Sequence, residues 1–504
     1  MGSLELRTIL IVKSIKSPFF WLLCLFILTA KGHLEIIDTD YSLRTAISIL
    51  ENGSMRIKPT DPEFIKYSVN PDADGLIYSQ YGIGLPILFI PFIISAQAIS
   101  SFINIPQDIV ISFLVSFYNI PFAILGLWFT REILKNLGVN LKQANATIVI
   151  IATCTAFWHY AVSDFSEVTQ FTLLLGCFYA ILSKYRIRWL IFSFGYTALL
   201  SVKVAYVILA PFFFVFGIYE CKRRKSSIIK EFFFGSFFIL PFGLFLAYIN
   251  FVRFGDILEF GYGNNLSTVF DIRKLFPLII PSIFSLNYGI MPFNPIILVF
   301  PLWIKIFNIR KSFAYLVLFI IISWFCLMCC YGASWGWGWG QRYLFIIIPL
   351  LVLPIAYLPS INLSKTVKVL FISLTISSGF IQLMSVSTKF HKPFTMKLEL
   401  KDRFQGSNVG QLSSTFLLFQ HKLLNGTVNY PLSIIGGNHK ESIDLSDYDS
   451  FRGFNFWPVH MMKFFKLDNY IRIFELILLS VIICLQFLLL RTHLPYLLGN
   501  QSRD

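Results

Sequence analysis

The sequence predicts an all-helical protein that crosses a membrane about 11–13 times. Of its 504 residues, 56% are hydrophobic and only 14% are charged, whereas soluble domains carry roughly 25% charge. The apolar residues run in blocks, such as 109–129, 232–251 and 471–490, and a helix needs about 20 residues to cross a bilayer. The 55 phenylalanines suit surfaces that face lipid or pack between helices.

The individual spans follow from where the apolar blocks begin and end. The block at 189–218 is too long for one span and too short for two full ones, and Lys203 lies at its centre. We expect two helices that meet inside the membrane at Lys203, with a turn that lines a wet cavity. The first block follows Arg7, Lys13 and Lys16 and lacks a small-residue cleavage site, so we expect an uncleaved helix. The expected spans lie near 18–34, 109–130, 146–162, 168–183, 189–218, 232–252, 290–307, 313–331, 343–358, 366–387 and 470–490.

Lysine and arginine are concentrated in short loops on one side of these spans, and the positive-inside rule makes that side cytoplasmic. The outer side then carries the long segments 35–82 and 388–469. Residues 83–103 are apolar, but a full span there would place the loop 131–142 outside, so we expect a helix lying in the outer interface. The basic elements that share one side are the N-terminus, Arg131/Lys135/Lys142, Lys184/Arg186/Arg188, Lys222–Lys225, Arg310/Lys311 and Lys365/Lys368.

The chain divides into three parts on this topology. Residues 1–387 form a membrane domain that contains the first outer loop 35–82 and the interfacial helix 83–103. Residues 388–469 are expected as an extracytoplasmic loop or small module, and 470–504 as the last transmembrane helix with a cytoplasmic tail. The expected location is the inner membrane of the cell, with multiple passes.

Several function classes are excluded by what the sequence carries. The net charge of +15 belongs to the topology signal, so nucleic-acid binding is not expected. The eight cysteines lie in or beside apolar segments and predict neither a disulfide framework nor a zinc site. The seven histidines show no metal-ligand spacing on one helix, and there is no phosphate loop, dinucleotide fingerprint or serine nucleophile elbow.

Two acidic clusters on the outer side are candidate catalytic sites. Asp38 and Asp40 precede a predicted helix at 41–50, so they lie at its positive N-terminal end, which favours the ionised form that a general base needs. Asp164 and Glu167 lie in a very short loop close to the membrane, where ionisable side chains tend to be paired or functional. The alternatives are a solvated helix cap for the first pair and a simple polar turn for the second.

The candidate phosphate ligands are cations that stand almost alone in apolar sequence. Lys203 and Arg342 are the main candidates, because arginine can contact phosphate oxygens in a bidentate manner and lysine as a point charge. Arg253 ends a span, so it is either a third ligand or a side chain that snorkels to the interface.

An alternation of tryptophan and glycine precedes Arg342. Trp335, Trp337 and Trp339 alternate with glycines and are followed by Gln341. A plain membrane anchor does not need glycines, whereas flat rings on a backbone that other groups can approach suit the apolar faces of sugars. We therefore expect a sugar-binding or acceptor-binding loop.

These stretches together resemble the GT-C superfamily of polyprenyl-phosphate-sugar-dependent glycosyltransferases, which includes the protein O-mannosyltransferases and the aminoarabinose transferase of lipid A. The likeness covers roughly residues 10–360 and depends on the order of the motifs more than on any one of them. Where many members carry a lysine in the entry to the interfacial helix, this chain has Gln80. The similar stretches are Asp38…Ala46-x-Ser48…Asn52-Gly53, Tyr78-Ser79-Gln80-Tyr81-Gly82-x-Gly84-x-Pro86…Pro91, Tyr160-Ala161-Val162-Ser163-Asp164, Asn287-Tyr288-Gly289…Pro292-x-Asn294-Pro295 and Trp335…Gly340-Gln341-Arg342-Tyr343…Pro349.

The resemblance implies an inverting hexosyl or pentosyl transfer on the extracytoplasmic face. Asp38 would be the general base, with Asp40 second, and Lys203 and Arg342 would hold the phosphate of the lipid-linked donor in place of the missing lysine. Tyr81 would join the sugar or acceptor site. The acceptor is a hydroxyl on a glycan, lipid or protein of the cell envelope.

Several questions stay open at the level of sequence. No cofactor is certain, and a divalent cation such as Mg²⁺ or Mn²⁺ on Asp38 and Asp164 is one alternative. Three other functions compete with the transferase: a transporter or flippase of lipid-linked glycans, a glycan polymerase or ligase of another fold, and a non-catalytic assembly subunit.

Overall fold

The structure is a computed structural model that describes residues 17–58, 68–69, 75–103, 105–259, 270–331, 338–389, 410–424, 428–431, 440–443 and 453–499. Seven helices in these ranges are long and apolar enough to cross a membrane, and shorter apolar helices of 10–17 residues accompany them. The predicted multi-pass helical fold is therefore confirmed. The seven are Gln107–Asn136, Val204–Arg224, Ile228–Phe254, Lys311–Cys330, Arg342–Ser360, Lys365–Ser387 and Asn469–Leu497.

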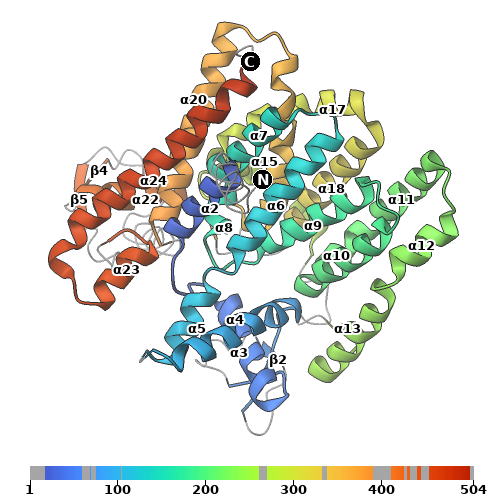
Figure 1. Cartoon of the computed structure of the whole chain (residues 1–504), viewed down its shortest axis with the longest axis horizontal. Coiled ribbons are helices and arrows are strands. Elements are labelled where there is room, and N and C mark those ends of the chain that lie inside the picture. The colour runs from blue at the N-terminus through green and yellow to red at the C-terminus, as the bar shows by residue number, and fades with distance from the viewer. Residues whose placement is uncertain are drawn as a thin grey trace, which may run out of the picture.

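The segment 37–115 folds into helices and a small sheet at one end of the bundle (bottom of Figure 1). Its short strands pair in the order β1-β3-β2, all antiparallel. Leu43, Leu85, Phe89 and Val115 form a separate apolar core between the helices. The elements are α2 (Pro18–Thr29), α3 (Ile37–Asn52), β1 (Arg56–Ile57), β2 (Ser68–Val69), β3 (Ile77–Ser79), α4 (Gly84–Ser100) and α5 (Gln107–Val115).

Two predictions about this segment can be compared with the structure. The helix expected at 41–50 begins earlier, at Ile37, so Asp38 and Asp40 lie within its first turn rather than ahead of it. The helix expected at 83–103 is present as α4, Gly84–Ser100. Its position in the membrane interface stays a prediction.

The centre of the bundle is built from helices that pack closely around α9. A hydroxyl–carbonyl hydrogen bond from Thr172 Oγ1 to Phe122 O, 2.8 Å long, joins α9 to α6. Between α7 and α9 the chain makes the short helix α8 and then a tight turn at 162–166. The elements are α6 (Asn119–Asn136), α7 (Leu141–Cys154), α8 (Phe157–Ala161) and α9 (Glu167–Leu182).

The apolar block at 189–218 forms two helices that fold back on each other, as predicted. The α-helical backbone stops at Lys203, which is extended with φ −151° and ψ 106°. Beyond this break, Phe213 packs against the rings of Phe192 and Tyr196, so the two arms lie side by side. The arms are α10 (Arg188–Val202), and η2 (Val204–Leu209) followed by α11 (Ala210–Arg224).

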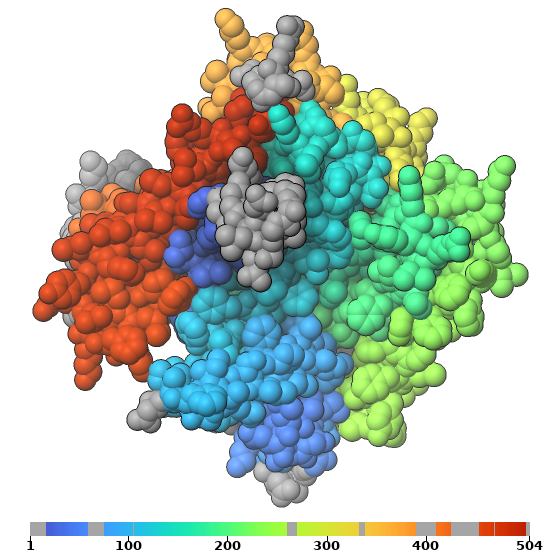
Figure 2. All heavy atoms as spheres, viewed as in Figure 1, coloured from blue at the N-terminus to red at the C-terminus, as the bar shows by residue number. Residues whose placement is uncertain are grey.

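The following helices flank the bundle, and proline-rich turns of 3-10 helix interrupt several of them. The pair α12–α13 lies along one edge and is largely exposed, as expected for a surface in contact with lipid (Figures 1 and 2). The elements are α12 (Ile228–Ser236), α13 (Ile239–Phe254), η3 (Ile272–Lys274), α15 (Leu275–Phe284), α16 (Ile290–Phe293), η4 (Pro295–Leu302), α17 (Trp303–Ile309), α18 (Lys311–Cys330), η5 (Arg342–Ile347), α19 (Ile348–Val352), η6 (Leu353–Ser360) and α20 (Lys365–Ser387).

The C-terminal part closes the structure by packing against the start of the chain. Trp457 donates hydrogen bonds from its backbone N–H to Ala30 O, at 2.8 Å, and from its indole N–H to Ile27 O, at 2.7 Å. Gly32, with φ +73°, leaves no room for a side chain, because a Cβ there would lie 2.5 Å from the Cβ of Trp457. The elements are α22 (Gln411–Leu424), the antiparallel pair β4 (Val428–Pro431) and β5 (Lys440–Ile443), α23 (Trp457–Phe464) and α24 (Asp468–Leu497).

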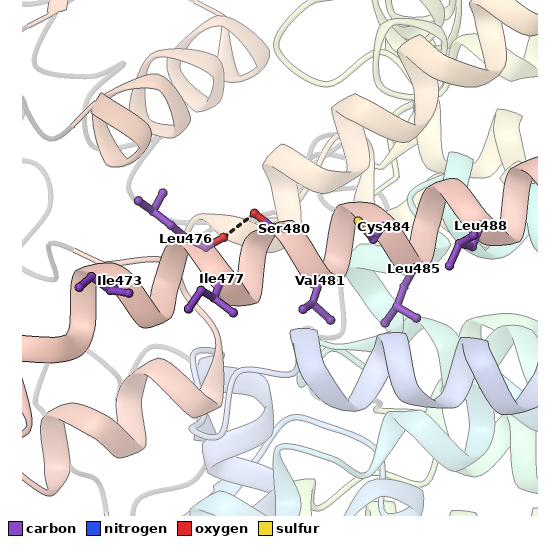
Figure 3. Close-up of a pocket in the computed structure, with 8 residues that line it drawn as sticks. All are labelled: Ile473, Leu476, Ile477, Ser480, Val481, Cys484, Leu485 and Leu488. Atoms are coloured by element: carbon purple, nitrogen blue, oxygen red, sulfur yellow. Dashed lines mark hydrogen bonds between the residues drawn. The ribbon is translucent and has the colours of Figure 1, made fainter.

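A groove runs along the outside of α24 and is lined mainly by apolar side chains (Figure 3). Its one hydroxyl, Ser480 Oγ, donates to Leu476 O of the same helix at 2.7 Å. This face suits lipid contact. The lining residues are Ile473, Leu476, Ile477, Ser480, Val481, Cys484, Leu485 and Leu488.

Candidate functional site

An arginine joined to two carboxylates is the centre of the candidate site. Arg342 Nη2 lies 2.6 Å from Asp38 Oδ2, and Arg342 Nε lies 2.7 Å from Glu167 Oε1. The three residues come from the first turns of α3, α9 and η5. The sequence indicates all three separately, and the structure brings them into one cluster.

The loop before η5 holds the Arg342 side chain in a fixed plane. Its guanidinium carbon lies 4.3 Å from the centre of the Phe165 ring, and the side chain is only 8% exposed. Tyr160 anchors the loop by donating its hydroxyl to Trp339 O at 2.8 Å. Gly340, with φ +60°, makes the turn that brings the chain close to Phe293. The cation is therefore oriented by packing as well as by charge.

Asp38 keeps an open side despite its ion pair. Its side chain is 29% exposed, compared with 2% for Glu167. Burial raises the pKa of Asp38, but the charge of Arg342, hydrogen bonds from Arg342 and Tyr81, and the charge of Lys203 outweigh it, so this pKa lies below its usual value. Asp38 is therefore ionised at neutral pH and can accept a proton.

Lys203 is the second cation of the site, and its main described contact is with an aromatic ring. Its ammonium lies 4.5 Å from the centre of the Tyr343 ring, a cation–π distance. The Arg342 guanidinium lies 5.5 Å from the same ring, so the two cations flank one aromatic side chain. Among the described residues, the Lys203 side chain has no hydrogen-bond or ion-pair partner. Arg342, which the sequence favours as an equivalent phosphate ligand, is already paired.

Arg253 and Tyr81 extend the cluster toward α13. Arg253 is 6% exposed, and its Nη2 donates to Tyr81 O at 3.0 Å. Tyr81 in turn hydrogen-bonds Asp38 through its side chain and packs edge-on against Tyr41. Arg253 is thus a buried contact of this network and not an arginine that snorkels into solvent.

Asp164 lies next to the cluster but acts on the backbone. Its Oδ2 accepts hydrogen bonds from the N–H groups of Glu35 and Ile36, both at 3.1 Å, and its carbonyl accepts from Thr39 Oγ1 at 2.6 Å. Burial and the negative charge of Glu35 raise the pKa of Asp164 to about 7. These contacts fix the N-terminus of α3 and so the position of Asp38.

Asp40 does not join the Asp38 cluster. Two residues along a helix are about 200° apart around its axis, and Asp40 instead pairs with Arg44 at 2.7 Å, both side chains being 38% exposed. It lines a separate hollow of about 680 Å³ together with Glu51 and Asp108. Of the two acids, only Asp38 therefore belongs to the Arg342 cluster.

The predicted sugar-binding loop differs from expectation where it can be described. Trp335 and Trp337 lie outside the described residues. Trp339 is 2% exposed and donates its indole N–H to Gln382 Oε1 at 3.2 Å, so its ring is a core side chain and not a platform for a sugar. Gln341 is also 2% exposed and contacts Ser282 at 3.5 Å. The adjacent glycines allow the rest of the protein to pack closely here. The alternation of tryptophan and glycine is equally compatible with a ligand that approaches the backbone, so the sequence does not distinguish the two.

The acidic residues do not fit a divalent metal site. In the part of the chain that the structure describes, no three His, Cys, Asp or Glu side chains gather as metal ligands. Asp38 already faces a guanidinium, and Asp164 Oδ2 is taken by two backbone N–H groups. Asp38 and Asp164 therefore do not together provide the set of free oxygen ligands that Mg²⁺ or Mn²⁺ would need.

A second polar cluster, which the sequence does not predict, supports the start of α3. Glu35 Oε1 accepts from Asn455 Nδ2 at 2.9 Å and lies 3.2 Å from His33 Nε2, while His460 Nε2 lies 3.0 Å from Asn455 Oδ1. Lys31 Nζ donates to Val386 O at 2.5 Å. The proximity of Glu35 to Asp38 in sequence was the one available signal. Nothing in the sequence links residues 33 and 35 to residues 455 and 460.

Comparisons with known proteins add one structural likeness. Neither a scan with family models nor a sequence search of curated proteins found a match. Among solved structures, the crystal structure of ArnT from Cupriavidus metallidurans bound to undecaprenyl phosphate superposes with a TM-score of 0.48 and 10% sequence identity, covering 99% of this chain and 79% of that one. A likeness of this degree does not assign the chain to a family.

Proposed function

We propose that the chain is a membrane glycosyltransferase that moves a sugar from a polyprenyl-phosphate donor to an acceptor hydroxyl on the extracytoplasmic face. The observation that carries the proposal is the grouping of an ionised, partly exposed Asp38 with Arg342 and with Lys203, which is unpaired among the described residues. A base beside two cations is what a transfer with an anionic leaving group requires.

The residues have separate parts in this reaction. Asp38 takes the proton of the acceptor hydroxyl, and the resulting oxygen attacks the anomeric carbon. The bond from that carbon to the phosphate oxygen breaks, and its electron pair stays on the polyprenyl phosphate. Lys203 contacts the phosphate, because it is the cation with no protein partner in the described structure, and the sugar inverts at the attacked carbon.

The proposed base can be tested with Asp38→Asn, which removes the proton acceptor and keeps the size of the side chain. Protein in liposomes is supplied with polyprenyl-phosphate hexoses, pentoses and amino sugars together with cell membranes as acceptors, and released polyprenyl phosphate is measured by mass spectrometry. Release should fall by roughly 10²–10⁴-fold, the contribution of a general base, with an unchanged amount of folded protein.

Asp271→Asn is the matched control, because Asp271 forms an ion pair with the exposed Arg273. Its release rate should equal that of the wild type. Full activity of Asp38→Asn would refute the assignment of the base. Movement of lipid-linked glycans across vesicles, without any release of polyprenyl phosphate, would establish the transporter alternative instead.

The phosphate ligand has its own test in Lys203→Met, which keeps an unbranched side chain only one atom shorter and removes the charge. Binding of a polyprenyl-phosphate analogue should weaken by about tenfold, the effect of one lost charge-assisted contact. Unchanged affinity would return Lys203 to a packing role on Tyr343.

A further inference from the structure

The guanidinium of Arg342 faces two carboxylates and keeps unused hydrogen-bond donors, which the proposed reaction can use. Two carboxylates, Asp38 and Glu167, share the single guanidinium of Arg342. A guanidinium has five N–H donors, and the two recorded bonds use Nε and Nη2. Within the described chain, Nη1 has no partner. Arg342 can therefore accept a further anion without first leaving both carboxylates.

The two carboxylates hold Arg342 differently. Glu167 binds Nε and is 2% exposed, while the ring of Phe165 lies against the guanidinium face. Asp38, whose side chain is 29% exposed, binds Nη2. The buried contact fixes the position of the arginine, and the open contact is the one that substrates can reach.

We propose that Arg342 transfers its electrostatic support from Asp38 to the donor phosphate during sugar transfer, and that Glu167 is the positioning residue that holds Arg342 for both tasks. This inference rests on the proposed function. It gives Glu167 a role distinct from the acid or base that the sequence indicates, because its carboxylate contacts the arginine and not the reacting atoms.

The atoms and charges of the step balance. The acceptor oxygen forms a bond to the anomeric carbon, its proton goes to Asp38, and the carbon–oxygen bond to phosphate breaks with its electron pair on the leaving group. Asp38 becomes neutral as the phosphate changes from a singly charged diester to a doubly charged monoester. The sum over both carboxylates, both cations and the donor is −1 before and after, so the buried site needs no change in net charge, only a redistribution.

The position of Lys203 supports this exchange. Lys203 and Arg342 both lie against the ring of Tyr343, at 4.5 and 5.5 Å from its centre. A phosphate that Lys203 holds is thus next to the guanidinium whose support Asp38 gives up. Lys203 provides the constant charge on the donor, and Arg342 provides the charge that increases as the bond breaks.

A double-mutant cycle of Asp38→Asn and Arg342→Gln tests the exchange, with release of polyprenyl phosphate as the readout. Asp38→Asn should lose roughly 10²–10⁴-fold in rate, as for loss of a general base, and Arg342→Gln roughly 10²–10³-fold, as for removal of one transition-state donor. The double variant should be no more than about threefold slower than the slower single variant, because groups that act as a unit give non-additive losses. Asp271→Asn with Arg273→Gln, an exposed pair of the same residue types, is the control cycle.

The positioning role has a separate readout. Glu167→Gln should lower kcat by about tenfold and change the donor KM by less than about threefold, because the arginine is held less well when charge develops. A purely structural role would lower only the amount of folded protein. Arg342→Lys keeps the positive charge but loses the paired N–H donors of the guanidinium. It replaces Arg342→Gln in the cycle if the Arg342→Gln protein does not fold.

The outcomes separate the two levels of the proposal. If the wild type releases no polyprenyl phosphate, the proposed function fails. If Asp38→Asn keeps full activity, the assignment of the base fails, and the exchange fails with it. If Asp38→Asn is slow but the losses of Asp38→Asn and Arg342→Gln multiply, Asp38 and Arg342 act independently, and the exchange fails while the transferase stands. An unchanged kcat in Glu167→Gln would refute the positioning role alone.

Discussion

Two clusters of carboxylates and arginines in the described structure have opposite compositions. Arginines outnumber carboxylates in one, and carboxylates outnumber arginines in the other. At the end of α11, one carboxylate, Glu220, contacts three arginines: Arg223, Arg224 and Arg310, at 2.8 to 3.1 Å. At the candidate site, one arginine contacts two carboxylates. Glu220 is fully buried, and both of its oxygens accept hydrogen bonds, whereas Asp38 is partly open.

The Glu220 cluster is a structural joint. Arg224 also donates to the carbonyls of Ile181, Leu182 and Ser183 at the end of α9, which leaves these terminal groups satisfied. Arg310, at the start of α18, connects that helix to the same carboxylate. Three helix ends therefore meet at one anion.

The two clusters differ in whether their polar atoms can still bind a proton or a ligand. Both oxygens of Glu220 accept hydrogen bonds from arginines, so Glu220 cannot bind a proton or a ligand without losing a contact between helices. The Arg342 cluster retains an unpartnered Glu167 Oε2, according to the described contacts, and an exposed edge of Asp38. A saturated cluster stabilises the fold, and an unsaturated one keeps groups available for chemistry.

The largest effect on stability is expected for Glu220→Gln. Removal of one partner from a buried ion pair leaves uncompensated charge, so the free energy of unfolding should fall by about 3 kcal/mol. Thermal unfolding in detergent measures this change. Release of polyprenyl phosphate per folded molecule should be unchanged, in contrast to Glu167→Gln.

Glu51→Gln is the control for that variant, because Glu51 is exposed and has no ion-pair partner in the described structure. It should leave the unfolding temperature as it is. A stable Glu220→Gln protein with a low kcat would reverse the assignment of the two clusters.

A pH dependence of intermediate size is expected near the candidate site. The pKa of Asp164 is raised to about 7 in the folded protein and is about 3.9 in an unfolded chain. The folded state therefore binds the proton more tightly, and stability is lost as the pH rises toward 7. Between pH 5 and pH 8 the wild type should lose about 2.5 kcal/mol relative to Asp164→Asn.

Unfolding curves of both proteins at several pH values measure this difference. The substituted asparagine would keep an oxygen acceptor for the backbone N–H groups, so Asp164→Asn should fold. Parallel stability curves for the two proteins would mean that Asp164 stays ionised in the folded state, with its burial offset by its hydrogen bonds.

The smallest effect is expected for Arg44→Gln, which breaks the pair between Arg44 and Asp40. Both side chains are 38% exposed, and exposed pairs of this kind contribute about 0.5 kcal/mol or less. Stability and transfer rate should both remain within experimental error. A loss of transfer would show that the hollow beside Asp40 takes part in the reaction and would weaken the case for Asp38.

The elements that could be predicted from sequence are those that local composition decides. A lysine in the middle of an apolar block marked the break at Lys203, since a charge there needs a polar turn. Isolation in apolar sequence likewise marks Arg342 as a candidate ligand, and the predicted helix N-terminus marks Asp38 as a candidate base. The sequence predicts the start of α3 too late, so both acids precede the predicted helix, whereas the observed helix begins at Ile37 and directs Asp38 and Asp40 to opposite sides.

The pairing itself depends on tertiary structure. Arg342 and Asp38 are separated by 304 positions, and no spacing rule connects them, so each was assigned to a different part of the substrate. Trp339 was assigned to the surface because its neighbouring glycines permit either a ligand or a packed ring. The contact of Glu35 with Asn455 had no sequence signal, because both are ordinary polar residues in loops.

The contact between Asn455 and Glu35 also bears on biosynthesis. The two residues are 420 positions apart, and ribosomes add about 5–20 residues per second, so roughly 20–80 s pass between their syntheses. During that interval the segment after α2 has emerged without the segment around Trp457 that secures it. The start of α3 therefore reaches its final geometry only after nearly the whole chain has been inserted, and a truncated product remains without an assembled candidate site.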